Sequence, residues 1–133
     1  MARVLLYNLR EENRRKKVKA LLFQLAIPSR EVQLAEQDHP LGYLLGLPDY
    51  APAGAGEEAP FSEEMLVMHA LSPRQFNGLL DGMKRAGIRL PLKAVVTPQN
   101  IAWSSRRLRQ ELRAEHEAMT AREKQTVSGT EIQ

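Results

Sequence analysis

Short apolar runs alternate with amphipathic segments along most of this chain. Runs of strand-forming residues lie at residues 4–7, 65–68 and 92–96, and a fourth segment, residues 31–36, alternates apolar with polar and charged residues as a half-exposed edge strand does. Apolar residues recur at helical spacing in the segments between and after them, at residues 11–27, 41–47, 72–86 and 98–124. Alternating strands and helices predict an α/β fold.

Local signals mark several helix ends. Ser72-Pro73 and Thr97-Pro98 each combine a hydroxyl N-cap with a proline at the first helical position. Pro28 stops the first helix after residue 27, and Gly87 fits just past the end of the third.

Two strand orders are compatible with the predicted strands and helices. We favour a single domain with a four-stranded, mostly parallel sheet in the order 2-1-3-4, flanked by helices and followed by a long C-terminal helix. The alternative is a ferredoxin-like α+β sheet in the order 4-1-3-2 with an extra C-terminal helix. The roughly 28 residues between the second and third strands exceed what a hairpin needs, which favours the first solution. The domain is expected at residues 1–124, with a mobile loop at 49–62 and a disordered tail at 125–133; no internal repeat is visible.

Composition excludes several classes of protein. Cysteine is absent from the 133 residues, which removes disulfides, thiol catalysis and sulfur-ligated metals. No apolar run approaches the roughly 20 residues of a membrane span, and no signal peptide is present, so we expect a soluble cytoplasmic protein that contacts no membrane.

The net charge of +3 hides a strong asymmetry. Residues 31–73 contain eight acids and no Lys or Arg, whereas residues 1–30 carry a net charge of +6 and residues 74–133 one of +5. The chain is therefore two-sided in charge rather than uniformly basic.

No catalytic, metal or cofactor residue is predicted. The three histidines, His39, His69 and His116, lie far apart and outside any His-Glu-x-x-His or Glu-x-x-His spacing. There is no Gly-x-Ser-x-Gly elbow and no glycine-rich phosphate loop.

One candidate ligand site depends on the topology. In a parallel sheet, ligands bind beyond the carboxyl ends of the strands where the winding reverses, and helix N-termini there attract anions. The side chains expected at that edge are Asn8, Arg10, Ser72, Arg74, Thr97, Asn100 and Trp103. The competing interpretation is that Ser72 and Thr97 only cap helices while Trp103 fills a gap. In the ferredoxin-like alternative, Asn8 and Arg10 would lie at the far edge.

A second candidate is a basic helical patch. Residues 14–17 place four cations in the early turns of the first helix, where they oppose the macrodipole, so an anionic partner is one reason for their presence. Right-handed crossovers in a parallel sheet would put the second long helix on the opposite face and return the last helix to the first face. The patch would then contain Arg14, Arg15, Lys17, Arg106, Arg107 and Arg109. Neutralisation of these residues by the acidic middle segment is the competing interpretation.

The segment 92–103 reads Leu-Lys-Ala-Val-Val-Thr-Pro-Gln-Asn-Ile-Ala-Trp, and the last helix contains Glu111-Leu112 and Glu115-His116. These residues resemble a small bacterial family known only as a domain of unknown function, whose pattern is Leu-Lys-Ala-Val-x-Thr-x-x-Asn-x-x-Trp followed by Glu-Leu-x-x-Glu-His. The resemblance extends to Asn8 and to residues 65–67, and so over most of residues 1–119. It implies a small intracellular α/β domain with no established activity, and it draws attention to Glu115 and His116.

The function that we predict is a non-enzymatic interaction or regulatory module that uses the basic helical face. Its partner would be an acidic protein surface or a nucleic-acid backbone, and the narrow apolar stripe of the last helix suits a homo-oligomer. Scarce aromatic residues argue against specific base readout. The alternative is a small-anion-binding protein or enzyme with its site at the carboxyl edge of the sheet.

Overall fold

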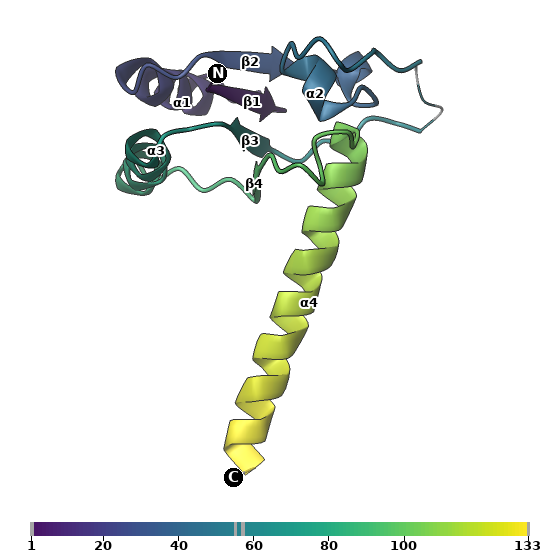
Figure 1. The fold of residues 1–133 in the computed structure, drawn as a ribbon. Coiled ribbons are helices and arrows are strands. Elements are labelled where there is room, and N and C mark those ends of the chain that lie inside the picture. Colours follow the sequence, from purple (N-terminus) through teal and green to yellow (C-terminus); the bar gives the residue numbers. More distant parts are fainter. Residues whose placement is uncertain (1, 55, 57, 133) are drawn as a thin grey trace.

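The computed structural model describes residues 2–54, 56 and 58–132, with side chains up to Thr120. Its sheet consists of β1 (Arg3–Tyr7), β2 (Ser29–Val32), β3 (Met65–His69) and β4 (Leu92–Val95), in the order β2-β1-β3-β4 (Figure 1). The α/β class and the strand order predicted from the sequence are confirmed. The sheet is mixed, because β1 pairs with β2 and β3 with β4 in parallel, while β1 and β3 are antiparallel.

Helices α1 (Glu12–Gln24) and α3 (Pro73–Arg85) cover one face of the sheet, and α2 (Leu41–Leu44) and the start of α4 (Ser105–Ile132) cover the other (Figure 1). The prediction that the first and last helices share a face was wrong. When β3 runs opposite to β1, two crossovers of the same hand place their helices on the same side of the sheet.

The two β-α-β units, β1-α1-β2 and β3-α3-β4, are related by an approximate two-fold axis through the centre of the sheet. Both begin with five-residue strands and continue with thirteen-residue helices. The residue after the first strand has positive φ in each unit, Asn8 in one and Ala70 in the other. Each helix ends on another positive φ, at Ala26 and at Gly87. The sequence did not reveal this repeat because the two units share geometry rather than residues.

The core on the α1/α3 face is formed by alternate residues of β1 and β3, including Leu6 and Leu66, and by the inner faces of the two helices. Gly78 and Gly82 on α3 leave room for Leu25 and Leu21 of α1, because a Cβ on either glycine would approach a leucine methyl carbon to 2.7 Å. The two helices therefore lie close together over the middle of the sheet.

The core on the opposite face includes Leu5, Tyr7 and Val67 from the sheet and Leu108 from α4. Tyr7 and Ser105 are both fully buried, and their hydroxyl oxygens lie 2.6 Å apart in a hydrogen bond. This contact fixes the first turn of α4 to β1.

Several boundaries differ from those predicted. The first helix ends at Gln24 rather than at residue 27. The final helix begins at Ser105 rather than Pro98, because the intervening residues form turns. It continues to Ile132, into the predicted tail, and beyond its first turns it projects away from the sheet (Figure 1); Gln133 lies outside the described residues. The predicted edge strand ends at Val32, and Leu34–Glu36 form a 3₁₀ turn.

The loop at 49–62 forms no helix or strand in the residues that the structure describes, among which Ala55 and Glu57 are not included. Within the described part of the chain, no helix combines the length and apolar character that crossing a membrane requires.

Candidate interaction surface

The arginines at the start of α4 are bonded to the acidic middle segment. Arg106 donates from Nε to Asp38 at 2.8 Å and from Nη1 to the carbonyl oxygen of Ala59 at 2.6 Å. The hydrogen bond from Arg106 lowers the pKa of Asp38. Arg109 donates to both carboxylate oxygens of Glu63, at 2.9 and 3.0 Å. These arginines hold the chain before β3 against α4.

Two consecutive glutamates before β3 join the helices of opposite faces. Glu64 accepts two hydrogen bonds from Arg14 on α1, at 3.1 and 2.7 Å. Glu63 accepts from Arg109 and, at 2.7 Å, from Arg113 on α4. Burial alone would raise the pKa of Glu63, but the hydrogen bonds from the two arginines lower it overall. Adjacent side chains in an extended chain point to opposite sides, which is why one glutamate serves each helix.

The structure divides the six residues of the predicted basic patch between the two faces. Arg14, Arg15 and Lys17 lie on α1, whereas Arg106, Arg107 and Arg109 lie on α4. Arg15 approaches Glu31 at 3.8 Å, and the guanidinium of Arg107 lies over the ring of Trp103, 4.3 Å from its centre. The acidic middle segment therefore engages most of these arginines, as the competing interpretation held.

The residues of the predicted anion site are also separated. Asn8 and Arg10 line a hollow of about 320 Å³ at the carboxyl ends of β1 and β2. Ser72 and Arg74 line another hollow, of about 390 Å³, which lies after the carboxyl end of β3, at the opposite end of the strands. The antiparallel pairing of β1 with β3 causes this separation. The amide of Asn8 donates to two backbone carbonyls, those of Phe61 and Glu63, at 3.0 and 2.9 Å.

Thr97, Asn100 and Trp103 shape the loop before α4. Thr97 donates its N–H to Asn100 Oδ1 at 2.8 Å, and Asn100 donates its own N–H to Thr97 Oγ1 at 3.1 Å. Asn100 Nδ2 also donates to the carbonyl oxygen of Val95 at 3.1 Å. The carbonyl of Trp103 accepts the N–H of Leu41 at 2.8 Å, which attaches α2 to this loop. The Thr-x-x-Asn-x-x-Trp pattern therefore has a structural role here.

The helix N-termini offer few free N–H groups to an anion. Glu11 accepts hydrogen bonds from the backbone of residues 13 and 14 at the start of α1. These two bonds lower the pKa of Glu11, so its carboxylate occupies the position that an anion would take. Ser72 accepts from the backbone of Gln75 on α3, and Ser104 from that of Arg107 on α4.

The histidines do not form a cluster. His69 ends β3, where burial lowers its pKa, and His116 lies on the exposed part of α4 with Glu115. His39 Nδ1 accepts the backbone N–H of Ala53 at 3.0 Å. Among the described residues, no group of three His, Cys, Asp or Glu side chains is arranged to hold a metal ion.

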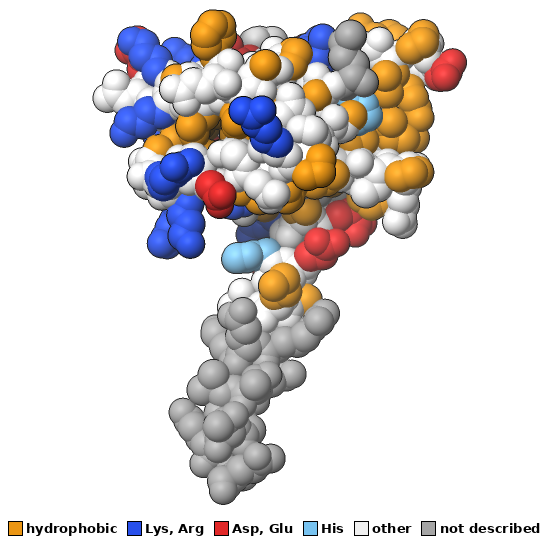
Figure 2. Space-filling model, turned by 60° about the vertical axis from the view of Figure 1, so that its left-hand side comes forward, with side chains coloured by type: hydrophobic (Ala, Val, Ile, Leu, Met, Phe, Trp, Pro, Cys, Tyr) orange, Lys and Arg blue, Asp and Glu red, His pale blue; other side chains and the backbone are white. Residues whose placement is uncertain are grey.

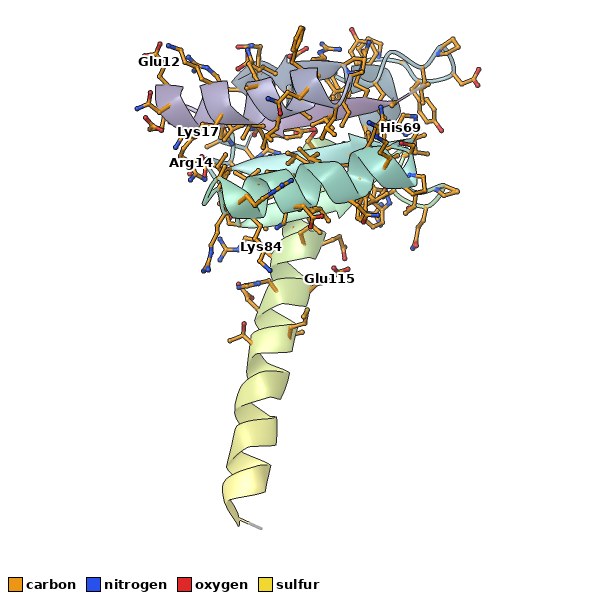
Figure 3. The ribbon with its side chains drawn as sticks, turned by 90° about the vertical axis from the view of Figure 1, so that its left-hand side faces the viewer. Glu12, Arg14, Lys17, His69, Lys84 and Glu115 are labelled. Atoms are coloured by element: carbon orange, nitrogen blue, oxygen red, sulfur yellow. The ribbon has the colours of Figure 1, made fainter. Side chains whose placement is uncertain are left out.

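Four exposed cations gather at one end of the α1/α3 layer. Figure 3 shows Arg14, Lys17 and Lys84 at this end and His69 at the opposite end. Arg14 donates to the carbonyl oxygen of Arg89 at 2.9 Å, which brings α1 beside the chain before β4. The side chains of Lys84, Arg89 and Lys93 line one hollow of about 600 Å³. None of the following residues forms an ion pair with a described side chain, and together we call them the basic end: Lys17, Lys84, Arg89 and Lys93.

Lys and Arg side chains crowd the same side of the body in the space-filling view (Figure 2). Sequence reasoning selected Lys17 but missed the other three residues, because it assigned α1 and α3 to opposite faces. Lys84 and Arg85 indicated little in the sequence, because the helix dipole favours cations in the last turn of any helix.

The predicted apolar stripe of α4 is divided between core and surface. Leu108 is buried, Leu112 packs partly against the sheet, and Met119 is 57% exposed. Self-association through α4 stays a prediction.

The second β-α-β unit is similar to a known family. Residues 64–119 match the family model described as a domain of unknown function, DUF3783. The matched segment runs from Glu64 through β3, α3 and β4 into the exposed part of α4, and so contains most of the basic end. The resemblance predicted from the sequence is confirmed for these residues. No curated protein and no solved structure gives a significant match to the chain.

Proposed function

We propose that this protein is a non-enzymatic interaction or regulatory module of the bacterial cytoplasm that binds an acidic protein surface through the basic end. The observation that supports this function is the contrast between the two sets of cations. Arg14 and three arginines of α4, Arg106, Arg109 and Arg113, are bonded to Asp38, Glu63 and Glu64, while the cations of the basic end extend into solvent. Exposed like charges held together repel one another, and a complementary anionic surface relieves that repulsion.

The floor of the basic end favours protein over nucleic acid. Beneath Lys84, Arg89 and Lys93, the hollow is lined by Leu80, Met83, Ile88 and Leu90. An apolar floor inside a cationic rim suits a partner that offers apolar side chains beside carboxylates. A phosphate backbone would leave that floor uncovered.

Charge reversal tests this function. The triple variant Lys84→Glu/Arg89→Glu/Lys93→Glu should bind fluorescein-labelled poly-L-glutamate at least about tenfold more weakly, since three exposed pairs at roughly 0.5 kcal/mol each amount to that factor. The control Arg10→Glu/Arg74→Glu reverses one exposed cation in each of the two hollows at the ends of the strands. It should bind poly-L-glutamate within about twofold of the wild type. Equal loss in both variants, or none in the triple variant, would contradict the proposal.

A labelled DNA duplex separates the two classes of partner. We expect it to bind more weakly than poly-L-glutamate at equal ionic strength. Tighter duplex binding, with a steep salt dependence that the triple variant removes, would instead identify a nucleic-acid-binding surface.

A further inference from the structure

We propose that the groove between α3 and the outer strand β4 binds an amphipathic helix of the acidic partner. The inference rests on the proposed function, of which it names the docking element. The groove consists of two hollows along the same side of α3. One, of about 600 Å³, lies at the basic end, and the other, of about 470 Å³, is lined by Phe76, Val95 and Val96 near the start of the helix.

The two-fold relation between the β-α-β units provides an internal comparison for this groove. The helix caps and the strand registers superpose Arg15 on Phe76, Lys19 on Leu80 and Glu31 on Val95. In the first unit these positions are charged and paired with one another, since Glu31 accepts from Lys19 at 3.0 Å and approaches Arg15 at 3.8 Å. Arg15 and Glu31 also line the hollow of about 320 Å³ at the carboxyl ends of β1 and β2.

In the second unit the same three positions are apolar. Val95 is 46% exposed, and Phe76 and Leu80 are partly exposed. A solvent-facing edge normally carries charged residues, as the first unit does. Apolar residues at the matching positions of one unit only indicate a surface that another element covers.

The outer strands of both units are left partly uncovered by the helices. Gly78 and Gly82 let α3 approach Leu25 and Leu21 at the centre of the helical layer. Lys93 and Val95, which point to the α3 side of β4, are exposed, as Ser29 and Glu31 are at the matching positions of β2. The two outer strands therefore differ in the chemistry of their exposed residues.

The occupant is a helix rather than an added strand. The outward-facing carbonyl of Val95 already accepts a hydrogen bond from Asn100 Nδ2, which takes the place of a neighbouring strand. The groove lies above the face of β4 and beside α3, where a further helix would extend the helical layer. Its extent along α3, from Pro73 to Lys84, is about 17 Å at 1.5 Å per residue, or about three helical turns.

The charge at the ends of the groove sets the direction of the occupant. Lys84, Arg89 and Lys93 stand at one end, and neutral residues including Ala70 and Asn77 line the other. Acidic residues are most stable in the first turn of a helix. The occupant therefore runs antiparallel to α3, with an acidic first turn at the basic end and an apolar stripe over Leu80, Phe76 and Val95.

The test uses helical peptides and full-length protein, with binding followed by fluorescence anisotropy. The probe is a fluorescein-labelled fourteen-residue peptide of Glu, Ala and Leu, with glutamates in its first turn and leucines on one face. A second peptide has the same composition and charge, but its leucines are scattered around the helix. The wild type should bind the first peptide about tenfold more tightly than the second.

The protein variant copies the first unit into the second. Leu80→Lys/Val95→Glu installs the ion pair that Lys19 and Glu31 form, and circular dichroism should show an unchanged fold. This variant should lose the preference for the first peptide yet still bind poly-L-glutamate, because the basic end is intact. The matched control Lys16→Leu/Glu12→Val removes an exposed ion pair of α1 whose residues line neither hollow of the groove, and it should keep the preference.

The outcomes separate the two proposals. Equal binding of both peptides by the wild type, or a preference that persists in Leu80→Lys/Val95→Glu, would overturn the groove while leaving the basic end standing. Loss of poly-L-glutamate binding only in the triple charge-reversal variant would support the basic end alone. If the wild type binds neither poly-L-glutamate nor the peptides, both proposals are wrong.

Discussion

The close approach of α3 to α1 can be tested by adding one methyl group. In Gly82→Ala, the new Cβ would lie 2.7 Å from Cδ2 of Leu21 and 3.4 Å from its Cδ1. Contacts under 3 Å force neighbours to move, and overpacking of this kind costs about 1–3 kcal/mol. Alanine also stabilises a helix interior by about 1 kcal/mol relative to glycine. The atom that must move is a terminal methyl carbon of the half-buried Leu21, so the cost lies at the low end of this range and nearly cancels the gain. We expect Gly82→Ala to change the free energy of unfolding by less than about 0.5 kcal/mol.

A double-mutant cycle with Leu21 separates the energy of the clash from the gain in helix propensity. In the Leu21→Ala background the clash is absent, so Gly82→Ala should raise the free energy of unfolding by about 1 kcal/mol. The expected coupling energy between the two positions is therefore about 1 kcal/mol, above the roughly 0.5 kcal/mol of independent sites. The measurement is urea unfolding followed by circular dichroism, with Gly78 and Leu25 as a second pair of the same geometry. If Gly82→Ala had the same effect in both backgrounds, the close packing of α3 against Leu21 would be wrong.

Three further predictions concern the contacts that hold the loop and α4 in place. Asn100→Ala should lower the free energy of unfolding by about 2 kcal/mol, because both hydrogen bonds of its side chain are lost and the N–H of Thr97 loses its partner; Gln99→Ala, on an exposed neighbour, should stay within about 0.5 kcal/mol in the same urea titration. Tyr7→Phe should cost about 1–2 kcal/mol because the buried hydroxyl of Ser105 is left unpaired, and Tyr7→Phe/Ser105→Ala should cost less than the sum of the two single changes. The lowered pKa of Glu63 means that its ionised form stabilises the fold above its ordinary pKa and that this contribution disappears as the pH falls. The destabilisation by Glu63→Gln, measured by urea unfolding, should therefore be largest at neutral pH and should shrink as the pH falls below the ordinary glutamate pKa of 4.5, and an effect independent of pH would contradict this assignment.

Local patterns in the sequence were sufficient for most of the elements, and the length of the connection between the second and third strands favoured the strand order that the structure has. The strands at residues 65–68 and 92–96 and the capped start of α3 at Ser72 followed from apolar runs and short-range chemistry, and the structure has them there. The same chemistry misled at Thr97-Pro98, where the threonine closes a turn with Asn100 instead of starting a helix. A hydroxyl residue followed by proline indicates a turn in which the side chain accepts a backbone N–H. Whether a helix continues from that turn depends on the surrounding tertiary contacts.

The candidate sites depended on one property that local patterns do not encode. The relative direction of β1 and β3 decides whether Asn8 lies beside Arg74 and whether α1 lies beside α3 or α4. The connection between β2 and β3 is long enough to permit either direction. Both the anion site and the patch of six cations therefore rested on a choice that the sequence left open.

The sequence by itself determined an α/β domain with separated charges and without cysteine chemistry, since composition and periodicity act over short distances. The tertiary structure alone decided which charges neutralise each other and which stay exposed. Glu63 and Glu64 pair with arginines from both faces because the chain places them between α1 and α4. Lys17 on α1 lies beside Lys84 on α3 because the antiparallel central pair of strands places α1 and α3 on the same face of the sheet. That juxtaposition involves residues more than sixty positions apart, and only the folded packing of the sheet brings them together.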